Sequence, residues 1–390
     1  MLNSKTFNNW KRYNKNGQTE LATISQKDNY IIKGNNLFTL KALIPIYKGK
    51  IKLICIDPPY NTGSNKFNYD DKYNHSAWLS FMEERLVVAR ELLTDDGIIF
   101  IHCDDTENAY LKILCDKLFG RENFITNLIW RKKAGGANDS NDIAVEHEYI
   151  LVYRKNKNGI YKIPLDTKTI ASYKYIDEKL NTHGKYKIKD LNDPSLSDSS
   201  GLHYDIKCPD REVLKAVERQ WKCNKKTFNE RLHDNRIIIK KVKNKWKVYY
   251  KIYLNEQRGK LSYDNEGKLI PRGRNLSSIL YNVALNKDGS TDIKKLFYGE
   301  NPFSYPKPVK LLKTLIQSAS KPGDIVLDFF AGSGTTAQAV LELNHEYGDR
   351  QFILIEQMDY INDVTVPRIE KSLDLYHSKD SFVYCEYKAN

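Results

Sequence analysis

The chain has 390 residues, 41% of them hydrophobic, and 62 Lys and Arg against 49 Asp and Glu give it a net charge of +13. A chain of this length can bury one large core or two smaller ones. No run approaches 18 apolar residues, and the start, Met1 to Lys5, lacks an apolar signal region. These features exclude an α-helical membrane protein and predict a soluble, cytoplasmic one with no membrane partner.

The positive charge is concentrated in the middle of the chain. Residues 151–300 hold 33 Lys and Arg against 18 Asp and Glu, whereas the other 240 residues together carry a small negative charge. Such a block is the electrostatic footprint of a module that binds a polyanion. No metal site is expected, since His203, Cys208, Cys223 and His233 match no common zinc-finger spacing.

The first 28 residues are polar and rich in Asn and Lys, and we expect a loose arm containing a helix there. Beyond them, short apolar runs alternate with segments of helical periodicity. The expected strands are residues 30–33, 51–56, 98–101, 125–130 and 148–153, and the expected helices are residues 37–47, 77–93 and 107–119. This alternation predicts an α/β fold with a mostly parallel sheet.

From about residue 155 the periodic pattern gives way to short strands and Lys-rich loops. The clearest strands are residues 237–239 and 246–253, and the second of them alternates aromatic with basic or polar residues. Such a strand is common in ordinary two-faced hairpins, but within a basic block it also fits nucleic-acid contact. The α/β pattern returns with a helix, a strand, a helix, a strand and a helix at residues 309–318, 325–328, 337–343, 352–356 and 361–375.

The apolar run 51–56 stops abruptly at Asp57, Pro58, Pro59 and Tyr60. Prolines neither continue a strand nor donate to its ladder, so these residues are presented at the carboxyl edge of a sheet, where open α/β sheets bind ligands. The Asp57 carboxylate and the Pro58 carbonyl could accept both hydrogens of a planar exocyclic amine, with the Tyr60 ring stacked on its heterocycle. The alternative is a plain Pro-Pro turn that Asp57 caps.

A second turn with a candidate binding role follows the strand at residues 325–328. Gly332-x-Gly334-x-x-Ala337 leads into a helix, and Glu356 ends the next strand, 22 residues after Gly334. Glycines let a ligand approach the backbone, and an acid at this distance can bind ribose hydroxyls. The pattern predicts a nucleoside ligand; NAD and a turn without any ligand are the alternatives.

Chain length argues that both turns belong to one sheet. Only 56 residues follow Gly334, enough for two helices and about one strand, so a sheet that begins at residue 325 cannot be completed downstream. The strands near residues 30, 51 and 98 must complete it. The glycine turn and the Asp57 turn are therefore expected side by side, with the basic block as an excursion between two halves of one domain.

Asp57-Pro58-Pro59-Tyr60 and the downstream run Asp328-Phe-Phe-Ala-Gly-Ser-Gly-Thr-Thr336 together resemble the circularly permuted, β-class DNA amino-methyltransferases. Within this group, the chain is similar to type III modification subunits and to stand-alone or type IIS adenine methyltransferases. The resemblance implies a doubly wound, Rossmann-like S-adenosylmethionine-dependent fold. Its catalytic domain comprises residues 1–154 and 296–390, and residues 155–295 form an inserted target-recognition region.

The resemblance also implies individual roles. Asp57, Pro58, Pro59 and Tyr60 would hold a flipped-out base by its amine, and Asp at the first position, in place of Ser, favours adenine N6 over cytosine N4. His102, at a strand end nearby, is expected to be structural. The implied cofactor-binding residues are Asn35, Pro306, Lys307, Asp328, Phe329, Phe330, Ala331, Gly332, Ser333, Gly334, Thr335 and Glu356.

The implied reaction is in-line transfer of a methyl group from S-adenosylmethionine to adenine N6 in double-stranded DNA, within a restriction-modification system. A homodimer and a cognate restriction endonuclease are compatible with the resemblance. The alternatives are a cytosine-N4, RNA or protein amino-methyltransferase, a DNA-recognition subunit without catalysis, and an NAD dehydrogenase.

Overall fold

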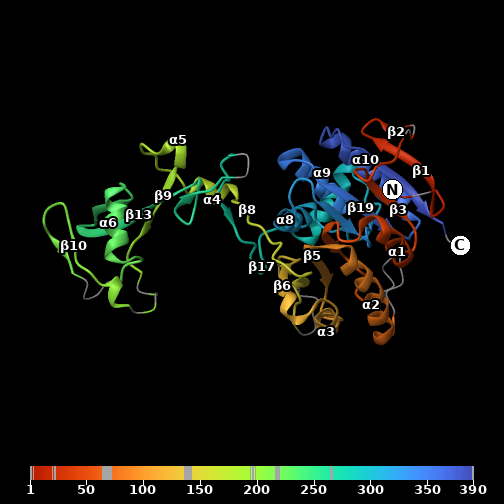
Figure 1. Ribbon diagram of the computed structural model, residues 1–390, viewed down its shortest axis with the longest axis horizontal. Helices are drawn as coiled ribbons and strands as arrows, with labels where there is room; N and C mark the ends of the chain where they lie inside the picture. The colour runs from red at the N-terminus through yellow and green to blue at the C-terminus, as the bar shows by residue number, and fades with distance from the viewer. Residues whose placement is uncertain are drawn as a thin grey trace. The chain divides into compact units, whose positions relative to one another are not determined.

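The computed structural model describes residues 2–388 except residues 3, 20, 22, 64–72, 136–142, 194, 196, 198, 216–219 and 264–266. The chain divides into two compact units. The first, called here the sheet unit, comprises residues 1–162 and 275–390, and the second, the inserted unit, comprises residues 163–274. Figure 1 shows that the sheet unit combines segments from the beginning of the chain, in red and orange, with segments from its end, in blue.

The described part of the sheet unit contains one eleven-stranded sheet, in the order β17-β6-β7-β5-β4-β18-β19-β3-β20-β1-β2. The strands are β1 (Phe7–Asn14), β2 (Gly17–Thr19), β3 (Asn29–Lys33), β4 (Ile51–Ile56), β5 (Leu93–Cys103), β6 (Phe124–Arg131), β7 (His147–Arg154), β17 (Ile279–Leu280), β18 (Ile325–Asp328), β19 (Gln351–Glu356) and β20 (Phe382–Tyr387). The central run from β5 to β20 is parallel, whereas β7 and β1 join it antiparallel. This arrangement confirms the predicted mostly parallel α/β sheet.

Helices cover both faces of this sheet, which confirms the doubly wound prediction. The helical segments are α1 (Asn36–Tyr47), α2 (His75–Leu92), α3 (Asn108–Phe119), α7 (Asn286–Leu296), α8 (Val309–Ala319), α9 (Thr335–Tyr347) and α10 (Val366–Leu375), with the short turns η1 (Arg121–Asn123) and η4 (Ile361–Thr365). Side chains alternate along a strand, so Ile54 and Ile56 of β4 pack into the core under α1, α2 and α3. Leu53 and Cys55 pack into the opposite core, under α8, α9 and α10. Among the described residues, every helix is too short or too polar to cross a bilayer.

The chain connections diverge between β4 and β18. From β4 the chain passes through α2 to β5 on one side, and from β18 it passes through α9 to β19 on the other. The parallel register pairs Ile54 with Leu327, so Asp57 and Asp328 both follow at the carboxyl edge. The two predicted turns are confirmed as neighbours, at the point of an open sheet where ligands bind.

The expectation of a loose helical arm at the start of the chain is wrong. Residues 7–19 form β1 and β2, and β1 pairs antiparallel with β20, with Phe7 opposite Tyr387 and Tyr13 opposite Phe382. The Phe7 side chain is buried. The partner strand β20 lies some 370 residues further along the sequence. A mostly polar strand with a single apolar face is hard to identify as a strand from its local sequence alone.

The inserted unit is shorter at both ends than the expected 155–295. The Lys155 N–H donates to the Gly97 carbonyl and the Tyr161 N–H to the Ser318 carbonyl, so residues 155–162 stay with the sheet unit. On the other side, β17 pairs in parallel with β6, and α7 packs against α8 and α10. The unit that remains holds 26 Lys and Arg against 15 Asp and Glu, a net charge of +11.

The inserted unit is made of short elements around a small core of its own. They are β8 (Ile163–Pro164), α4 (Thr167–Ala171), α5 (Leu180–His183), β9 (Tyr186–Asp190), η2 (Ser200–Leu202), β10 (Ile206–Lys207), β11 (Val213–Leu214), α6 (Lys225–His233), β12 (Ile237–Val242), β13 (Lys245–Tyr253), β14 (Glu256–Gln257), β15 (Lys260–Leu261) and β16 (Gly273–Arg274). β12, β13 and β9 form an antiparallel sheet. One face of it, including Val248, packs on Trp221 and Phe228.

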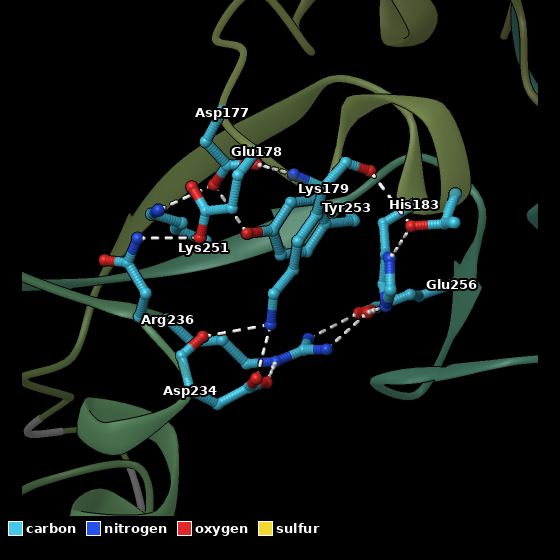
Figure 2. Close-up of polar contacts among 11 residues, drawn as sticks. Asp177, Glu178, Lys179, His183, Asp234, Arg236, Lys251, Tyr253 and Glu256 are labelled. Carbon is cyan, nitrogen blue, oxygen red and sulfur yellow. Dashed lines mark hydrogen bonds and ion pairs between the residues drawn. The ribbon is translucent and has the colours of Figure 1, made fainter.

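A network of charged side chains fastens α5 and the residues before it to this small sheet (Figure 2). Asp177 accepts from the Lys251 ammonium at 2.6 Å and from the Tyr253 hydroxyl at 2.7 Å. Arg236 pairs with Glu256 at 2.8 Å and also contacts Asp234. The cations of this network are balanced by carboxylates, so the excess positive charge of the inserted unit is carried by lysines and arginines elsewhere on it.

Candidate active site

A cavity of about 420 Å³ lies at the carboxyl ends of β4, β18 and β19, and residues from both ends of the chain line it. Every lining residue belongs to the sheet unit. Of the residues with expected roles, the lining contains Asp57, Pro58, Pro59, Tyr60, Pro306, Lys307, Asp328, Phe329, Phe330, Ala331, Gly332, Ser333, Thr335 and Glu356.

Two residues with expected roles lie outside this lining. Asn35 caps α1, since its Oδ1 accepts from the backbone N–H of Leu37, and the following residue, Asn36, lines the cavity instead. Gly334 precedes α9 in the left-handed region, with φ 82°, and a Cβ there would meet Cγ2 of Thr365 at 3.0 Å. Gly334 therefore permits the close packing that shapes the turn.

The Asp57 turn is fixed from behind. The indole N–H of Trp78, on α2, donates to the Pro59 carbonyl at 2.8 Å. Within the described part of the chain, no hydrogen bond occupies the Pro58 carbonyl, and 35% of the Asp57 side chain remains exposed. One rigid carbonyl and one partly exposed carboxylate thus lie at the same end of the cavity.

Four side chains meet at this end of the cavity. The Tyr60 hydroxyl lies 2.8 Å from Asp57 Oδ1 and 3.1 Å from Glu148 Oε2. The Lys307 ammonium lies 2.9 Å from Asp57 Oδ2, 3.0 Å from the Tyr60 oxygen and 3.4 Å from Glu148 Oε2. We call Asp57, Tyr60, Glu148 and Lys307 the tetrad.

The Lys307 cation sets the ionisation of the tetrad. Burial alone would raise the pKa of Asp57 and of Glu148, but neighbouring groups together lower both pKa values. The Lys307 ammonium contributes most among them, and the Tyr60 hydrogen bond adds to it at Asp57 and the Lys132 ammonium at Glu148. The same two carboxylates raise the pKa of Lys307 against the effect of its own burial. Burial and the neighbouring Asp57 carboxylate raise the pKa of Tyr60, so the phenol keeps its proton.

Glu148 belongs to the site, although its position in the sequence predicted no role for it beyond that of a strand residue. It lies on β7, is 6% exposed, and its second oxygen pairs with Lys132 at 3.1 Å. The signal available in the sequence was an acidic residue inside an otherwise apolar strand. Such a carboxylate is stable in a core only with partners, which here come from distant segments.

At the β18 end of the cavity lies Asp328, a buried carboxyl group whose pKa is close to neutral pH. Its Oδ2 accepts from the Thr336 hydroxyl at 2.6 Å and its Oδ1 from the Phe330 N–H at 3.0 Å. Burial raises the pKa of Asp328 to about 7, and the carboxylates of Asp57 and Glu356 add to the rise. A cation placed beside this carboxyl would ionise it, so this end of the cavity favours a positively charged ligand.

Glu356 is oriented by backbone donors. Its Oε2 accepts from the Gly332 N–H at 2.8 Å, and its Oε1 accepts from the N–H groups of Gln357 and Met358 at 2.9 and 3.0 Å. Gly332 has φ 52°, and a Cβ there would lie 3.5 Å from the Phe303 ring. The strand end and the glycine turn therefore hold one carboxylate rigidly beside open backbone, as a ribose site requires.

The glycine turn rests on an arginine that sequence reasoning missed. Arg368, on α10, is fully buried and donates to the hydroxyls of Ser333 at 2.6 Å and Thr335 at 2.8 Å, and to the Gln338 side chain at 2.8 Å. Burial lowers the pKa of Arg368 to about 10. A charged residue within the apolar stripe of an amphipathic helix is the feature of the sequence that could have identified Arg368 as a buried structural residue.

His102 lies beside the tetrad and lines the cavity, but it makes no polar contact with the other residues that the structure describes. Burial lowers its pKa to about 4, so the imidazole is neutral. Its ring packs edge-on to Trp130, with centroids 6.5 Å apart.

Comparison with known proteins agrees with this geometry. Residues 51–366 match the family model N6_N4_Mtase, described as DNA methylase. The chain is 33% identical, over 96% of its length, to the probable type III restriction-modification enzyme HindVI Mod subunit of Haemophilus influenzae, and 36% identical, over 86%, to the StyLTI Mod subunit of Salmonella typhimurium. These matches cover 55% and 53% of the two relatives, so the chain spans about half their length.

A relative of similar size is the type II methyltransferase M.KpnI of Klebsiella pneumoniae, which is 29% identical over 96% of this chain and 94% of its own length. The family match includes the Asp57 turn, Glu148, Lys307 and the glycine turn. This match and the likeness to the relatives show that this chain belongs to the N6_N4_Mtase family of DNA methylases.

Proposed function

We propose that this protein transfers a methyl group from S-adenosylmethionine to the exocyclic N6 of adenine in double-stranded DNA, as the modification enzyme of a restriction-modification system. One observation carries the proposal. A single cavity holds an amine-binding turn, Asp57 to Tyr60, at one end and a nucleoside-type turn with Asp328 and Glu356 at the other. The geometry thus provides for a donor and an acceptor in one enclosed space.

The β18 end fits the proposed cofactor. S-adenosylmethionine carries positive charge on its sulfonium and amino groups, which suits the near-neutral buried acid Asp328. Its ribose hydroxyls suit Glu356, and the backbone at Gly332 is open to the cavity. The aromatic rings of Phe303, Phe330 and Tyr360, which line the same cavity, supply apolar surface for an adenine ring.

At the other end, residues of this chain would orient the acceptor amine. Asp57 and the Pro58 carbonyl accept hydrogen bonds from the two N–H groups of this amine. These bonds direct the nitrogen lone pair toward the methyl donor. The Tyr60 ring stacks on the base, and this requires a flipped-out nucleotide because an amine inside the duplex is out of reach. When bound, the cofactor supplies an activated methyl group, so catalysis here needs no covalent bond to the enzyme.

The inserted unit supports a DNA substrate. Lys240 and Lys247 lie directly opposite each other in the β12–β13 hairpin, and Lys240 also covers the Tyr249 ring at 5.1 Å. Like charges in this position destabilise a sheet by themselves. In the part of the chain that the structure describes, neither lysine forms an ion pair, whereas Lys241 on the other face pairs with Asp210. A phosphate backbone would supply the missing negative charge.

Cytosine N4 is the alternative acceptor, because it also presents a planar exocyclic amine and the family model is named for both. Asp57 at the first position of the turn favours adenine through the resemblance described above. The likeness to Mod subunits and type II methyltransferases supports a restriction-modification role with a cognate restriction endonuclease.

The decisive experiment incubates the protein with unmethylated genomic DNA and S-adenosylmethionine labelled in its methyl group, then digests the DNA to nucleosides. We expect labelled N6-methyladenine by mass spectrometry and no labelled N4-methylcytosine. Label in N4-methylcytosine alone would show that cytosine N4, and not adenine N6, is the acceptor. Label in neither base would refute the proposal. Sequencing the modified DNA gives the recognition site.

A further inference from the structure

The Lys307 ammonium makes one hydrogen bond and two ion-pair contacts within the tetrad. It has three N–H groups, and three acceptors surround it: Asp57 Oδ2 at 2.9 Å, the Tyr60 oxygen at 3.0 Å and Glu148 Oε2 at 3.4 Å. Only 14% of the Lys307 side chain is exposed, so water provides little compensation if an acceptor is lost.

Two carboxylates converge on one phenol. The Tyr60 oxygen lies 2.8 Å from Asp57 Oδ1 and 3.1 Å from Glu148 Oε2, but a phenol has only one proton to donate. Like charges this close cannot both stay ionised in a buried site without a cation between them. Lys307 contacts both carboxylates, whereas Lys132 pairs only with the other oxygen of Glu148. Without Lys307 we expect one of the two carboxylates to take up a proton at a higher pH.

Glu148 has a second anchor that Asp57 lacks. Its other oxygen pairs with Lys132 at 3.1 Å, and only 8% of the Glu148 side chain is exposed, against 35% for Asp57. Glu148 is therefore held in place while Asp57 is free to exchange partners. If a ligand amine took over the Asp57 oxygen that Lys307 contacts, the contact with Glu148 would remain to hold the ammonium.

We propose that Lys307 and Glu148 are positioning residues of the methyl-transfer site: Lys307 keeps Asp57 ionised and aligned with Tyr60, and Glu148 retains Lys307 when Asp57 turns to the target amine. This inference rests on the proposed function, because the amine is the acceptor of that reaction.

Other ionisable groups face Asp57 and must be accounted for. His102, from β5, is neutral, and Cys55, from β4, is a buried thiol whose pKa burial raises. Asp328, from β18, titrates near neutrality in the ligand-free protein. These three groups remain in every variant below, so only differences between variants report on the tetrad.

The test compares the pH dependence of methyl transfer to DNA, at saturating S-adenosylmethionine, in the wild type, Lys307→Met, Lys307→Arg and the double variant Lys307→Met/Glu148→Gln. The measured quantity is the ratio of single-turnover rates at pH 8.5 and pH 6. We expect Lys307→Met to raise this ratio at least fivefold over the wild type, because Asp57 then shares one proton with Glu148. The rate ratios of the double variant and of Lys307→Arg should stay within fivefold of the wild-type ratio.

Lys313→Met is the matched control. Lys313 lies on α8, bridges the carboxylates of Glu342 and Glu346 at 2.6 and 2.7 Å, and is not among the residues that line the cavity. Its loss should leave the rate ratio unchanged. The proposal is overturned if Lys307→Met changes the ratio less than fivefold, or if adding Glu148→Gln fails to reverse the change.

A second measurement does not depend on activity. In protein labelled with ¹³C at Asp and Glu carboxyls, Lys307→Met should gain one carboxyl signal that titrates above pH 6, in addition to that of Asp328. The wild type and the double variant should lack it, and its absence from Lys307→Met refutes the inference. A wild type that transfers no methyl group would instead refute the proposed function, while this titration still tests the tetrad.

Discussion

The Arg368 guanidinium donates to the Ser333 hydroxyl at 2.6 Å, so a helix near the end of the chain supports the glycine turn from beneath. The same guanidinium also binds Thr335 and Gln338. Substitution by Met would leave these buried acceptors without their donor.

We therefore predict that Arg368→Met lowers the free energy of unfolding by about 2–4 kcal/mol. It should also weaken S-adenosylmethionine binding at least tenfold, because the backbone at Gly332 loses its support. Urea unfolding and calorimetric titration measure the two effects. Lys371→Met, on the same helix but only partly buried, is the control and should change stability by less than about 1 kcal/mol. An unchanged affinity in Arg368→Met would show that the turn holds its shape without Arg368.

Cofactor binding should depend on pH through Asp328. Its pKa is raised to about 7 in the ligand-free protein, and a bound cation favours the ionised form and lowers that pKa. Affinity for S-adenosylmethionine should thus increase as pH rises from 6 to 8, and binding at pH 7 should release part of a proton. Titration calorimetry in buffers of different ionisation enthalpy measures both quantities.

Asp328→Asn is the control for this pH dependence. The amino group of the ligand titrates equally against both proteins, so the difference between them isolates Asp328. We expect the variant to bind more weakly than the wild type at pH 8 and to lose most of the difference between pH 6 and pH 8. A variant with an unchanged pH dependence would assign the effect to another group.

Removal of the Asp57 carboxylate should affect turnover far more than binding. Asp57→Ala deletes the group that accepts from the target amine, and we predict a loss of about a thousandfold in the single-turnover rate. DNA affinity, measured by fluorescence anisotropy, should stay within about threefold, since phosphate contacts dominate it. Turnover close to that of the wild type would rule out the amine-holding role.

The paired lysines of the inserted unit should contribute to DNA affinity without sequence preference. Replacing both Lys240 and Lys247 by Ala should lower the slope of log affinity against log salt by up to about 2, equally for specific and unrelated duplexes. Lys215, whose charge is balanced by Asp205 at 3.0 Å, provides a control, and Lys215→Ala should leave the slope unchanged. A loss of affinity confined to one DNA sequence would indicate that these lysines read bases rather than contact phosphates.

Local patterns predicted most of the sheet and both turns. Alternating apolar runs gave strands such as β4 and β19, and the chain length remaining after Gly334 required the two turns to meet in one sheet. The register of Leu327 against Ile54 confirms that reasoning. These features were accessible because the information lies within a few residues, or in a simple count.

The missed features depend on partners that are remote in sequence. β1 is a strand because β20 provides its partner, and Glu148 is a site residue because Lys307 and Tyr60 reach it. Arg368 is stable in the core because Ser333 accepts from it. A sequence shows an unexpected charge in an apolar pattern, but it does not show which distant group satisfies that charge.

The strand order has a consequence for biosynthesis. β18 and β19 lie between β4 and β3, so the ribosome delivers these two strands after both of the strands that they separate. Until then β4 lacks a partner on one edge and β3, whose other neighbour β20 is made later still, lacks a partner on both edges, which invites wrong pairing with other chains. A nascent chain that stops before residue 325 contains Asp57 and Tyr60 but lacks the glycine turn and Glu356, so the complete cavity forms only late in translation.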